Sequence, residues 1–269
     1  MVNSIRAEIY KLTHRSYSYI LLLCCAAFAV LVAGLMCYIK YSAAPDVELI
    51  NFPLAINMLS MGMPIGLYLV AVGGDAVFSE QYKYNTLKNE VSYGLPRVRV
   101  YLSRLVVTLL LMVVVFVVTI GVYALASLAL LGIPSDAGSM ASFGKNTAQA
   151  IQDAFRMLGF YVLASFPLWL GAMSLAIALY FLIRSSNLAG LGFLAIMLAV
   201  PAIFDNLGKY INPVFFRLYH VTLDYMSGLV ISTDTLDWPL IGRCWLIGLA
   251  WAVISTAVGL LVFSRREIN

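Results

Sequence analysis

Six long apolar runs constrain what this 269-residue chain can fold into more than any other feature of its sequence. Each run is near the roughly 17 to 25 residues that a helix needs to cross the hydrocarbon core of a bilayer. Hydrophobicity is continuous within each run, whereas the strands of a membrane β-barrel alternate between polar and apolar residues. We therefore predict an all-α polytopic membrane protein whose six transmembrane helices lie at 17–39, 54–73, 105–131, 157–183, 188–204 and 243–263.

The composition excludes a soluble globular protein. Only 11% of the residues are charged and 62% are hydrophobic, whereas a soluble domain has about a quarter of its residues charged. The hydrophilic segments between the apolar runs are too short to form a second domain. We therefore predict that residues 1–269 form a single transmembrane domain.

The distribution of basic residues indicates the orientation, because cytoplasmic loops are enriched in Lys and Arg. With both termini in the cytoplasm, the inside holds eleven of the 17 basic residues and five of the 13 acidic ones, which leaves charges of +6 inside and −2 outside that sum to the net +4. We therefore predict a multi-pass plasma membrane protein with both termini cytoplasmic. Topology and anionic lipid headgroups explain the basic balance, so no nucleic acid partner is expected. The eleven inside residues are Arg6, Lys11, Arg15, Lys83, Lys88, Arg97, Arg99, Arg104, Arg184, Arg265 and Arg266.

Two hydrophilic segments on the predicted cytoplasmic side have helical patterns. Residues 1–16 repeat apolar side chains at helical spacing, which predicts an interfacial amphipathic helix: Val2, Ile5, Ile9 and Leu12. Residues 75–104 predict a helix, a turn at Gly94 and a second helix that starts near Pro96. This elbow is either a solvated loop or a docking surface for a cytoplasmic partner, and we favour docking.

The predicted extracellular segment 206–242 is dense in aromatic residues. Aromatic side chains concentrate at membrane interfaces, so we expect short helices that lie on the outer leaflet or dip into it. An aromatic belt and a substrate gate explain the composition equally well. The residues that we assign to an extracellular gate are Phe215, Phe216, Tyr219 and Tyr225.

The sequence contains little that suggests catalysis. The two histidines, His14 and His220, lie on opposite sides of the predicted membrane, and the four cysteines have no metal or disulfide spacing. No predicted span carries a strongly charged residue near its middle, which disfavours an ion-coupled secondary transporter. The predicted spans contain uncharged polar residues, for which two interpretations stay open: they line a substrate path, or they form contacts between helices. Those that we assign to the path are Asn57, Ser60, Thr108 and Thr119. The chain also has no GxxxxGK[ST] phosphate loop, so energy for transport must come from a separate ATPase.

These features together resemble the permease subunit of type-2 ABC exporters. In that family the first cytoplasmic loop has an acidic residue, a Gly-Thr-Leu-Lys stretch and a basic residue before the third span. Thr86, Leu87 and Lys88 match the stretch. Asn85 replaces the usual Gly and tolerates left-handed geometry, and Arg104 stands where Lys is common. The resemblance covers essentially the whole chain and rests more on topology than on any single residue.

The resemblance implies a dimer of permeases with two cytoplasmic ATPase subunits. The ATPases hold ATP and Mg, and this chain binds no cofactor itself. The resemblance implies that segment 75–104 contains the coupling helix that fits the ATPase. It also implies that residues 1–16 are the N-terminal interfacial helix of the family, which lies beside the coupling helix and is a different element from the elbow at 75–104. A homodimer is the simpler arrangement, and a pair of unequal permeases stays open. The residues assigned to ATPase coupling are Glu80, Tyr84, Thr86, Leu87, Lys88, Val91 and Arg97.

Small outer loops resemble those of family members that move amphipathic peptides, as in bacitracin resistance, lantibiotic immunity and phenol-soluble-modulin export. We therefore expect ATP-driven transport of amphipathic peptides or peptide antibiotics out of the cell or the membrane. The alternative is a membrane scaffold or sensor that recruits a cytoplasmic partner without transport. Recovery of an ATPase partner distinguishes the two functions.

Overall fold

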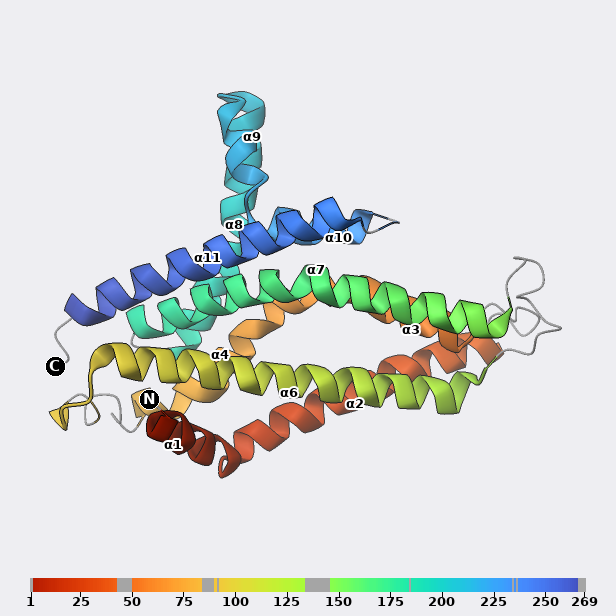
Figure 1. The fold of residues 1–269 in the computed structure, drawn as a ribbon, viewed down its shortest axis with the longest axis horizontal. Coiled ribbons are helices and arrows are strands. Elements are labelled where there is room, and N and C mark those ends of the chain that lie inside the picture. Colours follow the sequence, from red (N-terminus) through yellow and green to blue (C-terminus); the bar gives the residue numbers. More distant parts are fainter. Residues whose placement is uncertain are drawn as a thin grey trace. The chain divides into compact units, whose positions relative to one another are not determined.

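A computed structural model describes residues 2–42, 50–83, 90, 92–133, 146–183, 185–233, 235 and 237–265. The secondary structure of these residues is helical (Figure 1), and six helices are long and apolar enough to span a membrane. This confirms the predicted all-α class and the six spans. The helices extend beyond the predicted apolar runs because helical structure continues into the more polar flanks. Five spans are single helices: α2 (Ser16–Ser42), α6 (Arg97–Leu131), α7 (Thr147–Leu182), α8 (Ser186–Tyr210) and α11 (Trp238–Arg265).

The second span is broken in its middle. It consists of α3 (Phe52–Gly62), the 3-10 turn η1 (Met63–Ile65) and α4 (Gly66–Lys83). Pro64 causes the break, because proline has no backbone N–H and its ring clashes with the preceding helical turn. The start of α3 is fixed by Asn51, whose side chain accepts a hydrogen bond from the Leu54 N–H at 3.1 Å.

Three shorter helices complete the described chain: α1 (Val2–Thr13), α9 (Val214–Tyr219) and α10 (Leu223–Ser232). The helix predicted within residues 1–16 therefore forms as α1. Its buried side chains are Glu8 and Leu12, whereas Ile9 is exposed. The side of α1 that packs on the protein thus includes the charged residue Glu8, whereas Ile9 of the predicted apolar stripe is exposed.

The chain divides into two compact units. The second of these, unit 2, contains α2, α3, the later part of α6 and the earlier part of α7, over residues 16–63 and 113–162. Small side chains let its helices approach closely around Tyr123, whose hydroxyl donates a hydrogen bond to the Ala55 carbonyl at 3.1 Å. Lys40 Nζ donates to the Leu131 carbonyl at 2.8 Å and so caps the end of α6.

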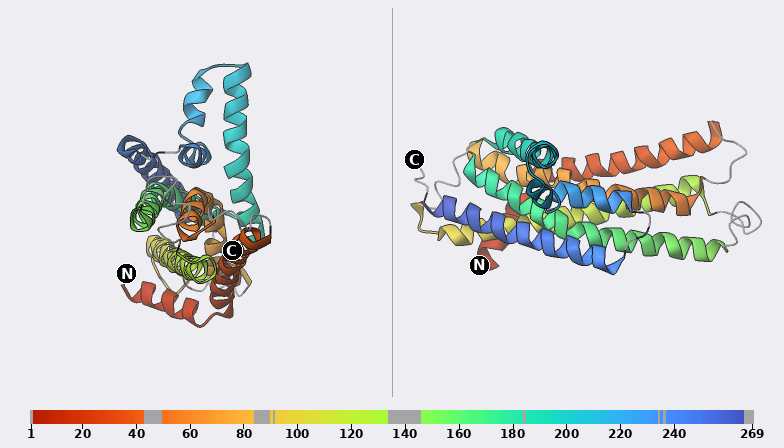
Figure 2. Two further views of the ribbon diagram at one scale, coloured as in Figure 1. Left: turned by 90° about the vertical axis from the view of Figure 1, so that its right-hand side faces the viewer. Right: turned by 90° about the horizontal axis from the view of Figure 1, so that it is seen from above.

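Unit 1 contains α1, α4, α8 to α11, the beginning of α6 and the end of α7, over residues 1–15, 64–112 and 163–269. Within it, α7 and α11 cross at Gly248, where an added Cβ would lie 2.3 Å from the Pro167 carbonyl oxygen. In the same unit, α8 runs across the direction of α11, and α9 folds back beside α8 (Figure 2).

Candidate functional site

The later part of α4 forms the beginning of the predicted coupling elbow, segment 75–104, and packs against an aromatic cluster. Gly74 leaves room for Tyr180, since a Cβ at Gly74 would lie 2.5 Å from the Tyr180 ring. The Tyr180 hydroxyl donates to the Ala71 carbonyl at 2.9 Å, and its ring stacks on Phe78 with centroids 5.3 Å apart. We call the following rings the aromatic cluster, because each contacts another member: Phe78, Tyr101, Tyr180, Phe181 and Phe263.

Arg104 is fully buried beside this cluster, with 0% of its surface exposed. Its guanidinium lies 5.6 Å from the Phe78 centroid and 5.7 Å from the Phe181 centroid, within range of cation–π attraction. Arg remains charged at any physiological pH, so burial requires a counterion. Glu90 provides it, at 2.6 Å from Arg104 Nη2.

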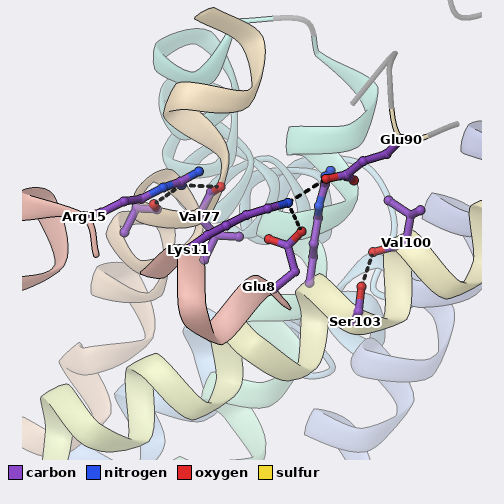
Figure 3. Close-up of polar contacts among 9 residues, drawn as sticks. Glu8, Lys11, Arg15, Val77, Glu90, Val100 and Ser103 are labelled. Atoms are coloured by element: carbon purple, nitrogen blue, oxygen red, sulfur yellow. Dashed lines mark hydrogen bonds and ion pairs between the residues drawn. The ribbon is translucent and has the colours of Figure 1, made fainter. Parts of the chain in front are cut away.

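Glu90 also joins α1 to this site (Figure 3). Its second carboxylate oxygen accepts a hydrogen bond from Lys11 Nζ at 2.8 Å, and Lys11 also donates to Glu8 at 2.9 Å. Partial burial lowers the pKa of Lys11, but the hydrogen bonds and charges of Glu90 and Glu8 outweigh that effect and raise the pKa above its ordinary value. We call Glu8, Lys11, Glu90 and Arg104 the ionic cluster.

Two further arginines of unit 1 donate hydrogen bonds to backbone carbonyls of other helices. Arg15 Nη1 donates to the carbonyls of Ala76 and Val77 at 3.4 and 3.3 Å, which connects the chain after α1 to α4 (Figure 3). Arg97 Nη1 donates to the carbonyls of Phe263 and Ser264 at 2.8 and 2.9 Å. Arg97 therefore caps the last turn of α11, where a cation also complements the negative end of the helix dipole.

Asp75 fixes the beginning of α8 to α4. Its carboxylate accepts a short hydrogen bond from the hydroxyl of Ser186, the first residue of α8. A carboxylate at the first turn of a helix is also favoured by the positive end of the helix dipole. Contacts from Arg15, which follows α1, and from α6, α7 and α8 thus converge on the later part of α4.

Most of the residues assigned to ATPase coupling cannot be placed at this site. Tyr84, Thr86, Leu87, Lys88 and Val91 lie outside the described residues. The backbone of Glu80 belongs to α4, and its side chain also lies outside the description. Arg97 is placed, and its contacts are to the end of α11.

The predicted path residues are divided between the two units. Ser60 donates to the Ile56 carbonyl at 2.8 Å, and Thr119 donates to the Val115 carbonyl at 2.7 Å, each within its own helix of unit 2. Thr108 belongs to unit 1 and donates to the Arg104 carbonyl at 2.9 Å. Asn57 is exposed on α3 in unit 2. Three of the four side chains therefore satisfy their hydrogen bonds in the helix that carries them.

Of the four predicted gate residues, two contact each other. Tyr219 and Tyr225 meet edge to face with centroids 4.8 Å apart. Phe216 packs on α8 at Gly208, where an added Cβ would lie 2.9 Å from the ring. Phe215 is half-buried in α9.

Sequence reasoning did not include the ionic cluster among the site residues. Arg104 was visible as the last charged residue before a long apolar run, and such a cation implies a counterion. Glu90 lies fourteen positions earlier in the sequence. No helical spacing connects two residues that far apart, so only the tertiary structure identifies Glu90 as the counterion of Arg104. The arrangement contains fixed charges and no reactive centre. Within the described ranges, no group of three or more His, Cys, Asp or Glu side chains is arranged to hold a metal.

Comparison with known protein families identifies the chain. Residues 4–216 match the sequence model of the ABC-2 family transporter proteins, from α1 through the first residues of α9. The chain belongs to the ABC-2 family of transporter proteins. A search of curated proteins found no match.

As an ABC-2 family protein, the chain is a membrane permease that lacks ATPase activity of its own. Permeases of this family generally pair with ATPase subunits and typically hold no cofactor. The ABC-2 permease is therefore a multi-pass membrane protein.

Proposed function

We propose that this ABC-2 permease couples to two cytoplasmic ATPase subunits through segment 75–104 and exports amphipathic peptides. ATP and Mg bind on the ATPases. A second copy of the permease completes the transport path. The observation that carries the proposal is the double contact of Glu90 with Lys11 and Arg104.

That double contact gives the elbow a mechanical connection to two other helices. Glu90 lies within segment 75–104, between the proposed coupling residues Lys88 and Val91, whereas Lys11 belongs to α1 and Arg104 belongs to α6. A displacement of the elbow by the ATPase therefore moves charges that are paired with both helices. Because Arg104 is buried, separating it from Glu90 is costly, and α6 follows the elbow instead.

The proposed orientation in the membrane and the proposed substrate class are supported by the sequence. Eleven of the 17 basic residues lie on the side of the two termini, which supports cytoplasmic termini and a cytoplasmic elbow. The polar side chains available to a path are uncharged, which suits a molecule with a large apolar surface. Tyr219 and Tyr225 supply aromatic contacts on the segment that we propose as the extracellular gate.

The test is purification of the tagged chain from its native membrane in mild detergent, with mass spectrometry of the proteins that co-purify and an assay of ATP hydrolysis. We expect a stoichiometric ATPase and hydrolysis that peptide stimulates. Leu87→Asp should abolish ATPase recovery. Asp205→Asn, which removes an exposed ion pair with Lys209 on α8, should not. Recovery of the permease alone would support the scaffold or sensor function.

A further inference from the structure

A small pocket in unit 1 lies among α7, α8, α10 and α11. Its wall is largely apolar and includes Leu175, Met197, Pro201 and Trp251. Asp224 is the one charged residue among those that line it. The pocket has room for a group about the size of a water molecule.

The pocket lies at the level of the membrane-spanning helices. Trp251 is in the middle of α11, and its indole N–H donates to the Val221 carbonyl at 2.8 Å. The helix α10 begins two residues later at Leu223, with Asp224 in its first turn. The segment between α8 and α11 therefore lies, at Val221, beside the middle of α11, and then continues through α10 to the start of α11. It carries a carboxylate to a depth where charged groups are rare and usually functional.

Polar contacts with the broken second span hold Asp224 in place. The hydroxyl of Tyr68, near the start of α4, donates a short hydrogen bond to the Asp224 carboxylate. One turn further along α10, the buried Ser227 hydroxyl donates to the Pro64 carbonyl at 3.1 Å. This carbonyl belongs to the turn η1 at the helix break. The break and α10 are thus joined at two points.

The Asp224 carboxylate retains capacity for a ligand. A carboxylate accepts about four hydrogen bonds, and Tyr68 supplies one of them. In the part of the chain that the structure describes, no Lys or Arg side chain pairs with Asp224, and the nearby Lys209 pairs with Asp205 at 2.5 Å. A carboxylate at membrane depth is stabilised by a cation.

We propose that this pocket binds the primary ammonium group of an amphipathic peptide. The size of the pocket suits a compact ammonium and excludes the larger guanidinium and trimethylammonium groups. The Trp251 ring at its wall favours a cation through cation–π attraction. The exposed apolar side chains of Leu194 and Leu198 on α8 offer contact to the rest of the peptide. The inference rests on the proposed transport function, since it names the substrate group that the permease recognises.

The test measures binding of a fluorescein-labelled amphipathic peptide with one lysine and an acetylated N-terminus. The permease, together with any ATPase that co-purifies with it, is placed in phosphatidylcholine nanodiscs without nucleotide, and fluorescence anisotropy is corrected with empty discs. The same peptide is used with acetyl-lysine, which lacks the charge, and with trimethyl-lysine, which keeps the charge and adds bulk. We expect the lysine form to bind about tenfold more tightly than either of the others.

Asp224→Asn should remove this preference, and Asp224→Glu should keep it in part. Tyr68→Phe should also keep it, because the charge remains. The matched control is Asp153→Asn, which removes a carboxylate from α7 in unit 2. Equal binding of the lysine and acetyl-lysine forms by the unmodified protein, or an unchanged preference in Asp224→Asn, would overturn the proposal.

Two further outcomes separate related hypotheses. Loss of the lysine preference when phosphatidylethanolamine is added to the discs would assign the pocket to a lipid headgroup and overturn the peptide ligand. The binding assay needs no ATP hydrolysis, so a lysine preference that depends on Asp224 in a permease that recovers no ATPase would overturn the proposed function and leave the pocket assignment standing.

Discussion

Glu90 lies 2.6 Å from the guanidinium of Arg104, and Arg104 is completely buried beside the contacting rings of Phe78 and Phe181. The pair joins Glu90 of segment 75–104 to α6 at a point where water does not reach the Arg104 side chain and reaches Glu90 only in part. Removing the Glu90 charge leaves the Arg104 charge buried without its counterion, which is more costly than losing a surface ion pair.

Glu90→Gln is therefore expected to lower the stability of the permease by about 3 kcal/mol and to uncouple hydrolysis from transport. The amide keeps the size of the side chain and removes the charge that Arg104 and Lys11 share. Thermal unfolding in detergent and peptide-stimulated ATP hydrolysis measure the two effects. Asp205→Asn is the control, and an equal effect of both variants would contradict the coupling role of Glu90.

Arg104→Lys is expected to cost about 1 to 2 kcal/mol, because an ammonium does not reproduce the contacts that the planar guanidinium makes with two neighbouring rings. The charge is conserved, so the Glu90 pair should survive and partial transport activity should remain. Unfolding experiments together with transport in proteoliposomes check this ranking. Activity of Arg104→Lys as low as that of Glu90→Gln would show that ring contacts matter as much as the charge.

The ionic cluster predicts a pH dependence with a defined sign. The pKa of Lys11 in the folded protein is raised above its ordinary value of 10.5. The stabilisation by Lys11 is therefore complete below pH 10.5 and is lost as the pH rises through the folded pKa. The difference in melting temperature between the unmodified protein and Lys11→Met should stay constant from about pH 7 to pH 10 and shrink above that range. A difference that already shrinks near pH 8 would contradict the pairing.

Gly248→Ala is expected to destabilise unit 1 by about 2 kcal/mol or more, because the added Cβ would lie 2.3 Å from the Pro167 carbonyl oxygen. This neighbour is backbone and cannot rotate away. Gly242→Ala on the same helix is the control, because an added Cβ there has nothing within 4 Å. Denaturant unfolding of the two variants should differ by that amount, and equal stability would argue against the close crossing of α7 and α11.

Ser227→Ala is expected to cost about 1 kcal/mol, because the Pro64 carbonyl loses its hydrogen bond inside the protein. Ser232→Ala is the matched control on α10, because that hydroxyl is exposed and bonds within its own helix. The double variant with Tyr68→Phe should show a coupling energy above about 0.5 kcal/mol, since both bonds fix the same helix. Strict additivity in unfolding experiments would show that the two contacts act independently.

The six spans follow from the sequence because hydrophobicity over some twenty residues is a local property. Pro64 lies in the middle of the second predicted span, and the structure has the turn η1 there because proline disrupts a helix locally. The amphipathic pattern of residues 1–16 predicted α1, but not which of its side chains would be buried. The mild polar residues of the spans were visible too, yet most of them bond within their own helices.

The charged pairs were decided by tertiary structure alone. Glu90 and Arg104 are separated by fourteen positions, and Tyr68 and Asp224 by 156. No local pattern links such residues, because a charge in the sequence does not show which partner compensates it. The sequence also placed Asp224 in a segment outside the spans, whereas the fold returns it to the middle of α11. The sequence alone thus determined how many helices cross the membrane, and the packing of those helices determined where their few charges are buried, since a charge at that depth is stable only where the fold supplies its partners.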